Sequence, residues 1–286
     1  MKKQLFFALV TLNFVYLASC NKNSVSELEI PNIDSNYLTK YTYTESNNSF
    51  LYSVETSFIY DSFKRVTKIL VKPDSNYVTK FLYNGSERLP YMMSVDTSGV
   101  IESRTFYTYL FNGQLSKDST ISKTFNTSGQ LNILIKIIKK YIRSGDKIYE
   151  AIRYERLNTL NNNLQIENDF DTTTLDLNDN PILLSQRVRT INCTYGSNPS
   201  PMVNVNINPI YSLEDDEAIL FQSIGSKNII NTWKHTNINN GVGTITYNKN
   251  YTNSYTFKAN GYPSSIMANA QNGTSLNFKF TYGSLQ

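Results

Sequence analysis

A short turn motif recurs along most of this chain and constrains its fold more than any other feature. In each copy an aromatic or aliphatic residue precedes Asp or Asn, a turn that usually contains Gly follows, and an apolar residue opens the next segment. Copies begin at Tyr60, Tyr83, Val95 and Phe125, and looser versions lie at 175–184 and 257–263. Asp or Asn can bond its own backbone to start a reversal, and Gly adopts the positive φ that the reversal needs. The motif therefore predicts a succession of β-hairpins.

Some copies lack Gly where the motif expects it. The replacements are Lys64, Glu87 and Asn180. A residue with a Cβ is disfavoured at positive φ, although Asn tolerates that region best. We expect these turns either to differ in geometry or to carry strain.

The segments between the turns alternate in polarity, which is typical of strands with one packed face and one wet face. The predicted strands are 41–43, 58–60, 66–71, 77–83, 105–111 and 244–257. The composition agrees, because 21 Tyr and 15 Phe stand against a single Trp. Aromatic side chains fit a half-buried pleated surface, so packing is the first explanation for their abundance.

Segment 131–143 is ambiguous. Leu131, Leu134, Ile135, Ile138 and Ile142 fit a helical stripe, with lysines opposite. Four isoleucines within six residues favour a strand, and a turn copy leads into the segment. We interpret it as a long strand; as a helix it would be suited to lying on a membrane surface.

One short helix is predicted at 213–224. Ser212 is a favourable N-cap, and the acidic run 214–217 suits the positive end of a helix. Gly225 can end the helix.

The predicted fold class is all-β. Antiparallel hairpins form a meander that makes a curved, extended sheet or an open barrel, with the one helix near 213–224. Residues 37–286 form a single β-rich domain. The sheet must curl or pack on itself, because a sheet exposed on both faces could not bury its tyrosines.

The N-terminus has the features of an export signal. Lys2 and Lys3 precede an apolar stretch, 5–16, that is too short to span a bilayer, which needs roughly 20 residues. Leu17-Ala-Ser-Cys20 then resembles the lipobox of bacterial lipoproteins. The resemblance implies removal of 1–19, a diacylglyceryl group and an N-acyl group on Cys20, and a polar tether over 20–36. The alternative is a secreted protein without lipid.

A lipidated Cys20 makes the membrane the first predicted partner, because two acyl chains bind a bilayer far more tightly than one. Asn21 is not the aspartate that retains some lipoproteins in the inner membrane, so we expect the protein in the outer membrane. The sequence does not distinguish the periplasmic side from the cell surface. Without Lys2 and Lys3 the net charge falls below +4, which is not the footprint of a nucleic-acid-binding protein.

The wider pattern resembles secreted Bacteroidota lipoproteins of unknown function with irregular YD-repeat-like hairpins. The copy at Tyr60-Asp61 is similar to a YD repeat. Further shared features are Asn208-Pro209 before the acidic run, and the late turn 260–263. The resemblance covers most of 37–286 and implies an architecture but no activity.

No residue set predicts catalysis. His235 is the only histidine, and no carboxylate or cysteine lies near it in the sequence. Cys193 is alone once Cys20 is lipidated, so it is expected to be a small buried residue. No metal-spaced cluster or phosphate-binding glycine loop is present, so the chain is predicted to be non-enzymatic, without metal or cofactor.

The leading functional hypothesis is a non-catalytic binding or structural module of the cell envelope. Its ligand would be a glycan, held by aromatic stacking, or a protein, held by pairing at a sheet edge. The candidate ligand-binding residues are Trp233, Tyr262 and the series Tyr247, Tyr251 and Tyr255, whose spacing puts all three on one strand face. The alternatives are a carrier of lipid or of a lipidated protein in an apolar cavity, and a glycoside hydrolase that uses carboxylates alone.

Overall fold

The computed structural model describes most of the chain after residue 36. The described residues are 37–47, 50–72, 77–97, 100–185, 189–203, 205, 227–239, 244–270 and 273–284. They belong to one compact unit, Asp34–Gln286. The lipobox, the tether 20–36 and the predicted helix 213–224 lie outside the described residues.

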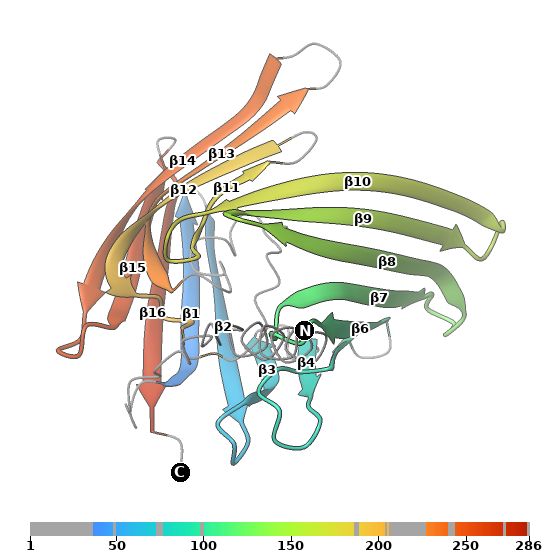
Figure 1. Ribbon diagram of the computed structural model, residues 1–286, viewed down its shortest axis with the longest axis horizontal. Coiled ribbons are helices and arrows are strands. Elements are labelled where there is room, and N and C mark those ends of the chain that lie inside the picture. Colours follow the sequence, from blue (N-terminus) through green and yellow to red (C-terminus); the bar gives the residue numbers. More distant parts are fainter. Residues whose placement is uncertain are drawn as a thin grey trace, which may run out of the picture. The chain divides into compact units, whose positions relative to one another are not determined.

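The described chain forms a closed barrel of sixteen antiparallel strands (Figure 1). The strands are β1 (Tyr37–Asn47), β2 (Phe50–Tyr60), β3 (Val66–Lys72), β4 (Tyr77–Leu82), β5 (Met92–Thr97), β6 (Ile101–Tyr109), β7 (Leu115–Phe125), β8 (Leu131–Ser144), β9 (Lys147–Asn158), β10 (Asn163–Leu175), β11 (Pro181–Ser185), β12 (Arg189–Pro199), β13 (Asn228–Asn239), β14 (Thr244–Phe257), β15 (Pro263–Ala270) and β16 (Ser275–Gly283). Each strand pairs with its neighbours in sequence, as a meander does. The barrel closes where β1 pairs with β16, from Tyr37 opposite Gly283 to Ser46 opposite Ser275.

The all-β prediction is confirmed, and the sheet closes completely rather than staying open. The six predicted strands lie in β1, β2, β3, β4, β6 and β14. Segment 131–143 is a strand, within β8. The described residues include no helix.

The inner face of the barrel is largely apolar where β1–β4 and β11–β16 meet. Leu38, Phe58, Trp233, Ile266 and Phe278 are among the buried members of one core cluster there. Aromatic rings pack directly, since the ring centroids of Trp233 and Tyr251 are 5.1 Å apart. Burial of these side chains is the main source of stability for the barrel.

The outer face of β1 and β16 is polar. Strand alternation and the registers place Thr42 and Thr44 of β1 beside Lys279 and Asn277 of β16 on this face. Lys40 also lies there, where it pairs with Glu55 of β2 at 3.0 Å. The barrel is thus apolar inside and polar outside where β1 meets β16, whereas the outer faces of β2 and β4 also expose Leu51, Ile59 and Leu82.

Several hairpins share one turn geometry. The N–H of the first turn residue donates to the carbonyl of the fifth, and the N–H of the fourth donates back to the carbonyl of the first. The turns are 61–65, 110–114, 126–130, 176–180 and 258–262. The fourth residue has positive φ in each of them, and it is Gly at 113, 129 and 261. This is the three-residue hairpin loop that ends in a bulge.

Two of the three expected exceptions are corrected by the structure. Lys64 does adopt positive φ, at 61°. In the turn 176–180 the strained residue is Asp179, at 63°, and not Asn180. After Tyr83 the positive φ falls on Gly85, at 52°, so Glu87 does not replace a glycine; the chain places the reversal on the residue for which it costs least.

Candidate functional site

Charged side chains are buried on the inner face of β7–β10. Asp118, Lys139, Glu150 and Asp171 are each no more than 8% exposed. The registers bring them together, because Asp118 lies opposite Lys139, and Glu150 lies opposite Asp171. We refer to these four residues as the inner charge cluster.

The contacts within the cluster pair most of these charges. The hydroxyl of Tyr141 donates to Oδ2 of Asp118 at 2.6 Å. Nζ of Lys139 lies 3.2 Å from Oε1 of Glu150. A buried charge is tolerated only when it is paired and hydrogen-bonded, so these contacts are required by the fold.

Glu150 has the most informative protonation equilibrium of the cluster. Burial raises the pKa of Glu150 to about 7; Lys139 opposes the rise, while Asp171 and Asp118 add to it. The carboxyl group therefore changes charge near neutral pH. A strongly perturbed carboxyl is a marker of functional sites, although structural ion pairs produce it too.

A polar cavity of about 170 Å³ lies further along the same wall. It is lined by Arg156 and Asn158 of β9, with Asn163 and Gln165 of β10 opposite them. These side chains lie on the same face of the sheet as Glu150 and Asp171. Arg156 is six residues beyond Glu150 on β9, which corresponds to roughly 20 Å along the strand. Amide and guanidinium groups donate and accept several hydrogen bonds each, which suits a ligand rich in hydroxyl groups.

A hydrolase needs two carboxylates in an open cleft. Glu150 and Asp171 are neighbours on adjacent strands, and one of them has a raised pKa. Both are buried, at 7% and 5% exposure. The cavity lined by described residues lies at the other end of these strands and does not adjoin the two carboxyl groups. The described residues therefore do not favour a hydrolase site at Glu150 and Asp171. In the described part of the chain no group of three or more metal-ligating side chains could hold an ion.

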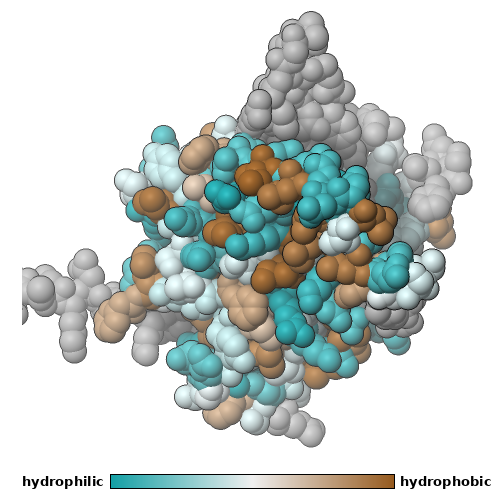
Figure 2. Space-filling view, turned by 90° about the vertical axis from the view of Figure 1, so that its right-hand side faces the viewer, coloured by the Kyte–Doolittle hydropathy of each residue, from teal (hydrophilic) through white to brown (hydrophobic). Residues whose placement is uncertain are grey.

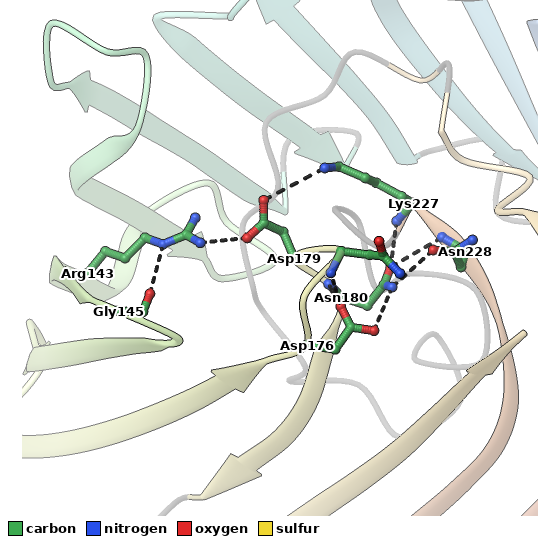
Figure 3. A network of polar contacts seen from close by, with 8 residues as sticks. Arg143, Gly145, Asp176, Asp179, Asn180, Lys227 and Asn228 are labelled. Atoms are coloured by element: carbon green, nitrogen blue, oxygen red, sulfur yellow. Dashed lines mark hydrogen bonds and ion pairs between the residues drawn. The ribbon is translucent and has the colours of Figure 1, made fainter. Parts of the chain in front are cut away.

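A second polar cluster joins three parts of the chain near the β10–β11 turn (Figure 3). Asn180 is fully buried; its amide nitrogen donates to Asp176 and Asn228, and its oxygen accepts from the backbone N–H of Lys227 and Asn228. Asp179 receives a 2.5 Å hydrogen bond from Arg143. Every polar atom of the Asn180 side chain is used internally, so we interpret this cluster as structural.

Three of the predicted ligand-binding aromatics are buried. Trp233, Tyr251 and Tyr262 are 1%, 2% and 3% exposed. Tyr255 shares the face of Tyr251, as the spacing predicted, and its hydroxyl donates to the carbonyl of Ile230. Tyr262 packs against Tyr282, with the two ring centroids 5.6 Å apart.

The remaining predicted positions differ in what the structure describes. Tyr247 pairs with Asn237 in the β13–β14 ladder. Cys193 is buried, and burial raises the pKa of its thiol to about 12. Cys20 lies outside the described residues, so its lipidation stays a prediction.

Sequence reasoning missed the inner charge cluster and the polar cavity. A signal was present, because Lys139 falls in phase with Ile133, Ile135 and Ile137 along β8. Glu150 likewise sits between Ile148 and Ile152. A charged residue in the apolar phase of a strand indicates either a buried ion pair or a wet interior.

The barrel resembles solved structures of porin-like proteins. One, from Bacteroides vulgatus ATCC 8482, shares 13% sequence identity with this chain and has a TM-score of 0.51; the match covers 87% of this chain and 100% of that one. Another, from Bacteroides uniformis ATCC 8492, also shares 13% identity, over 86% of this chain and 97% of that one, with a TM-score of 0.35. The first match shows a common fold.

No family model matches the chain, and no curated protein matches it. Among the described residues there is no helix of the length and apolar character needed to cross a bilayer.

Proposed function

We propose that this chain is a non-catalytic lipoprotein of the cell envelope. It is anchored to the outer membrane by lipid on Cys20, and its barrel stands in water. The barrel binds a glycan against the inner wall of β9 and β10. The observation that carries the proposal is the polarity of the two barrel faces. The lipobox at Cys20 and the fold shared with a porin-like protein support an envelope location.

The outer face of β1 and β12–β16 is unlike that of a strand barrel embedded in lipid. Such barrels present an apolar band of roughly 25 Å to the hydrocarbon and keep their polar residues inside. Here Lys68, Lys136 and Lys140 lie in the outward phase of their strands: Lys68 pairs with exposed Ile59, and Lys140 lies between the buried residues Lys139 and Tyr141. A lysine at mid-bilayer depth costs about 2–4 kcal/mol, so repeated outward lysines favour a barrel in water.

The glycan is favoured over a protein ligand by the closure of the barrel. Pairing at a sheet edge needs a free edge, and each of the sixteen described strands has two neighbours. The four side chains that line the described cavity carry amide or guanidinium groups, which fits hydroxyl-rich ligands. The partly exposed pair Tyr154 and Ile152 lies on the inner face between the cavity and the charge cluster and adds apolar surface for a sugar ring.

The anchor is tested in cells by labelling with an alkyne fatty acid. The wild type and Cys193→Ala are expected to take up label, while Cys20→Ala does not. In parallel, a form whose first 20 residues are replaced by an ordinary cleavable signal is expected in the soluble fraction or in the fraction that high salt releases from membranes. Retention of that form in outer membranes washed with high salt would show that the barrel itself is embedded and would overturn the proposal.

Ligand binding is tested on a glycan array with matched variants of one strand. Gln165→Ala removes an inward side chain of the cavity, and Asn168→Ala removes an outward amide from the same strand. We expect saturable binding to one glycan class that is lost in Gln165→Ala and kept in Asn168→Ala. Equal loss in both variants, or no glycan bound by the wild type, would exclude the cavity as the site.

A further inference from the structure

The outer face of β7–β10 is strongly cationic. Its exposed basic residues are Lys117, Lys123, Lys136, Lys140, Lys147 and Arg153. The one acidic residue in the outward phase of these described strands is Glu155, which accepts a 2.7 Å hydrogen bond from Arg153. We call this outward surface of β7–β10 the basic wall.

Apolar side chains are exposed among these cations. Phe170 is 74% exposed, Ile142 is 68% exposed and Leu164 is 54% exposed, and Tyr149 lies directly opposite Ile142. Figure 2 faces the side on which the hairpins of β7–β10 end, and there brown apolar patches lie between teal hydrophilic ones. A face that met only water would have no use for so much exposed aliphatic and aromatic surface.

The outer face of β14–β16 provides the contrast. Its outward residues include Thr252 and Ser254 of β14, Asn269 of β15, and Ser275 and Asn277 of β16. These five are small, neutral and polar; Lys279 of β16 and Met267 of β15, which is 46% exposed, also lie in the outward phase. Cations and exposed apolar groups also meet on the outer face of β2–β4, where Lys68 lies opposite Ile59 and Lys80, so the contrast is between β7–β10 and the far side of the barrel at β14–β16.

The register adds an unfavourable feature that a ligand would relieve. Lys117 of β7 lies directly opposite Lys140 of β8 on the basic wall. Like charges directly opposite each other across an antiparallel pair destabilise a sheet. An anionic group bridging the two ammonium groups would remove that repulsion.

From these observations we propose that the basic wall docks on a membrane surface of anionic phospholipids. The lysines would contact lipid phosphates while their methylene stems lie along the apolar surface. Ile142 and Phe170 would enter the interface between headgroups and acyl chains, as the apolar face of an interfacial helix does. Membrane attraction then has the two sources that such binding requires, charge and buried apolar area.

The inference goes beyond the proposed function and does not depend on the lipid at Cys20. The whole strand ladder lies between Tyr37 and Gly283, and β1 closes on β16, so a chain from Asn21 to Gln286 contains the complete barrel. This unlipidated mature chain is the test protein. Failure of lipidation and failure of docking are therefore separate results.

The experiment is co-flotation with vesicles of phosphatidylcholine, alone or mixed with phosphatidylglycerol, at low and high salt. We expect binding to the anionic vesicles only, weakened by salt. Lys136→Glu/Lys140→Glu is expected to lower the partition coefficient by roughly 25-fold or more, because each basic residue near the surface contributes about fivefold. Lys234→Glu/Lys279→Glu, which makes the same charge change on β13 and β16, is expected to bind nearly as well as the wild type.

Circular dichroism and thermal unfolding of each variant establish that the barrel is intact. Ile142→Ser/Phe170→Ser separates insertion from simple charge attraction, and we expect it to weaken binding at both salt concentrations. The proposal is overturned if the two lysine pairs have equal effects, or if neutral vesicles bind as well as anionic ones. It is also overturned if the apolar variant binds like the wild type, which would indicate attraction to any polyanion.

Discussion

The hydroxyl of Tyr60 donates a 2.8 Å hydrogen bond to the main-chain carbonyl of Leu38 on the neighbouring strand. The same relationship recurs at five other hairpins: a tyrosine in or directly after an even-numbered strand donates to a carbonyl at or near the start of the strand before it. The other pairs are Tyr83–Val66, Tyr109–Pro90, Tyr195–Pro181, Tyr255–Ile230 and Tyr282–Pro263. Part of the abundance of tyrosine thus has a structural cause, because six of the 21 tyrosine hydroxyls satisfy carbonyls at one end of the barrel.

Removing one of these hydroxyls is expected to weaken the barrel without emptying its core. Tyr60→Phe and Tyr282→Phe each should lower the free energy of unfolding by about 1 kcal/mol, the net contribution of a typical hydrogen bond. Urea denaturation measures the change. Tyr149→Phe is the control, since Tyr149 is 45% exposed on the outer face, and it should change stability little. Equal effects at 60 and 149 would contradict the assigned role.

The fold could be predicted from the sequence wherever the signal was local. Alternation predicted strands such as β3 and β14, and the density of isoleucines chose strand over helix for β8. Closure could not be predicted, because the pairing of Tyr37 with Gly283 joins opposite ends of the domain and leaves no mark in either segment. The candidate site was missed for a similar reason: Glu150 and Asp171 meet only through the register of β9 and β10.

The turn at 61–65 contains a residue that is strained by its backbone. Lys64 has a φ of 61°, a region that costs a side chain with a Cβ roughly 1–2 kcal/mol. Lys64→Gly should therefore raise the free energy of unfolding by up to about 1 kcal/mol, as measured by chemical denaturation. The gain is smaller than the strain because glycine also loses more entropy on folding.

Lys64→Ala distinguishes strain from the loss of the side chain. Nζ of Lys64 lies 5.7 Å from the ring centroid of Tyr37, so truncation removes a cation–π contact. Alanine loses this contact and keeps the unfavourable φ, so it should not be stabilising. If alanine and glycine stabilise equally, backbone strain is not the cause.

The buried guanidinium of Arg65 predicts an acid-sensitive turn. Arg65 is 7% exposed and donates to Asp61 at 2.8 and 2.6 Å. Partial burial alone would raise the pKa of Asp61, but the hydrogen bonds and charge of Arg65 outweigh it and lower the pKa below 3.8. A lowered pKa gives stability that is present above the unfolded value and lost as the pH falls through the folded one.

Asp61→Asn should therefore be more destabilising at pH 7 than at pH 3. Unfolding free energies of the wild type and the variant, measured across this range, should converge below about pH 4. A difference that stays constant down to pH 2.5 would mean that the charge of Asp61 does not act through Arg65.

Glu150 predicts a pH dependence of the opposite sign. Burial raises the pKa of Glu150 to about 7 in the folded barrel, against 4.5 for the exposed group, so the folded state binds the proton more tightly. Stability is then full below about pH 4.5 and falls as the pH rises toward 7, by about 2–3 kcal/mol if other groups are unchanged. Glu150→Gln keeps a neutral side chain of the same size and should flatten this slope, although Lys139 loses its 3.2 Å partner.

Glu155→Gln is the matched control for that experiment, because Glu155 lies on the outer face of the same strand and pairs with Arg153 rather than with Lys139. Its unfolding curve between pH 5 and pH 8 should follow the wild type. If Glu150→Gln and Glu155→Gln retain the same slope, the proton taken up between pH 8 and pH 5 is not on Glu150. The carboxyl group of Glu150 would then be ionised across this range, and a raised pKa could no longer mark the inner charge cluster as a functional site.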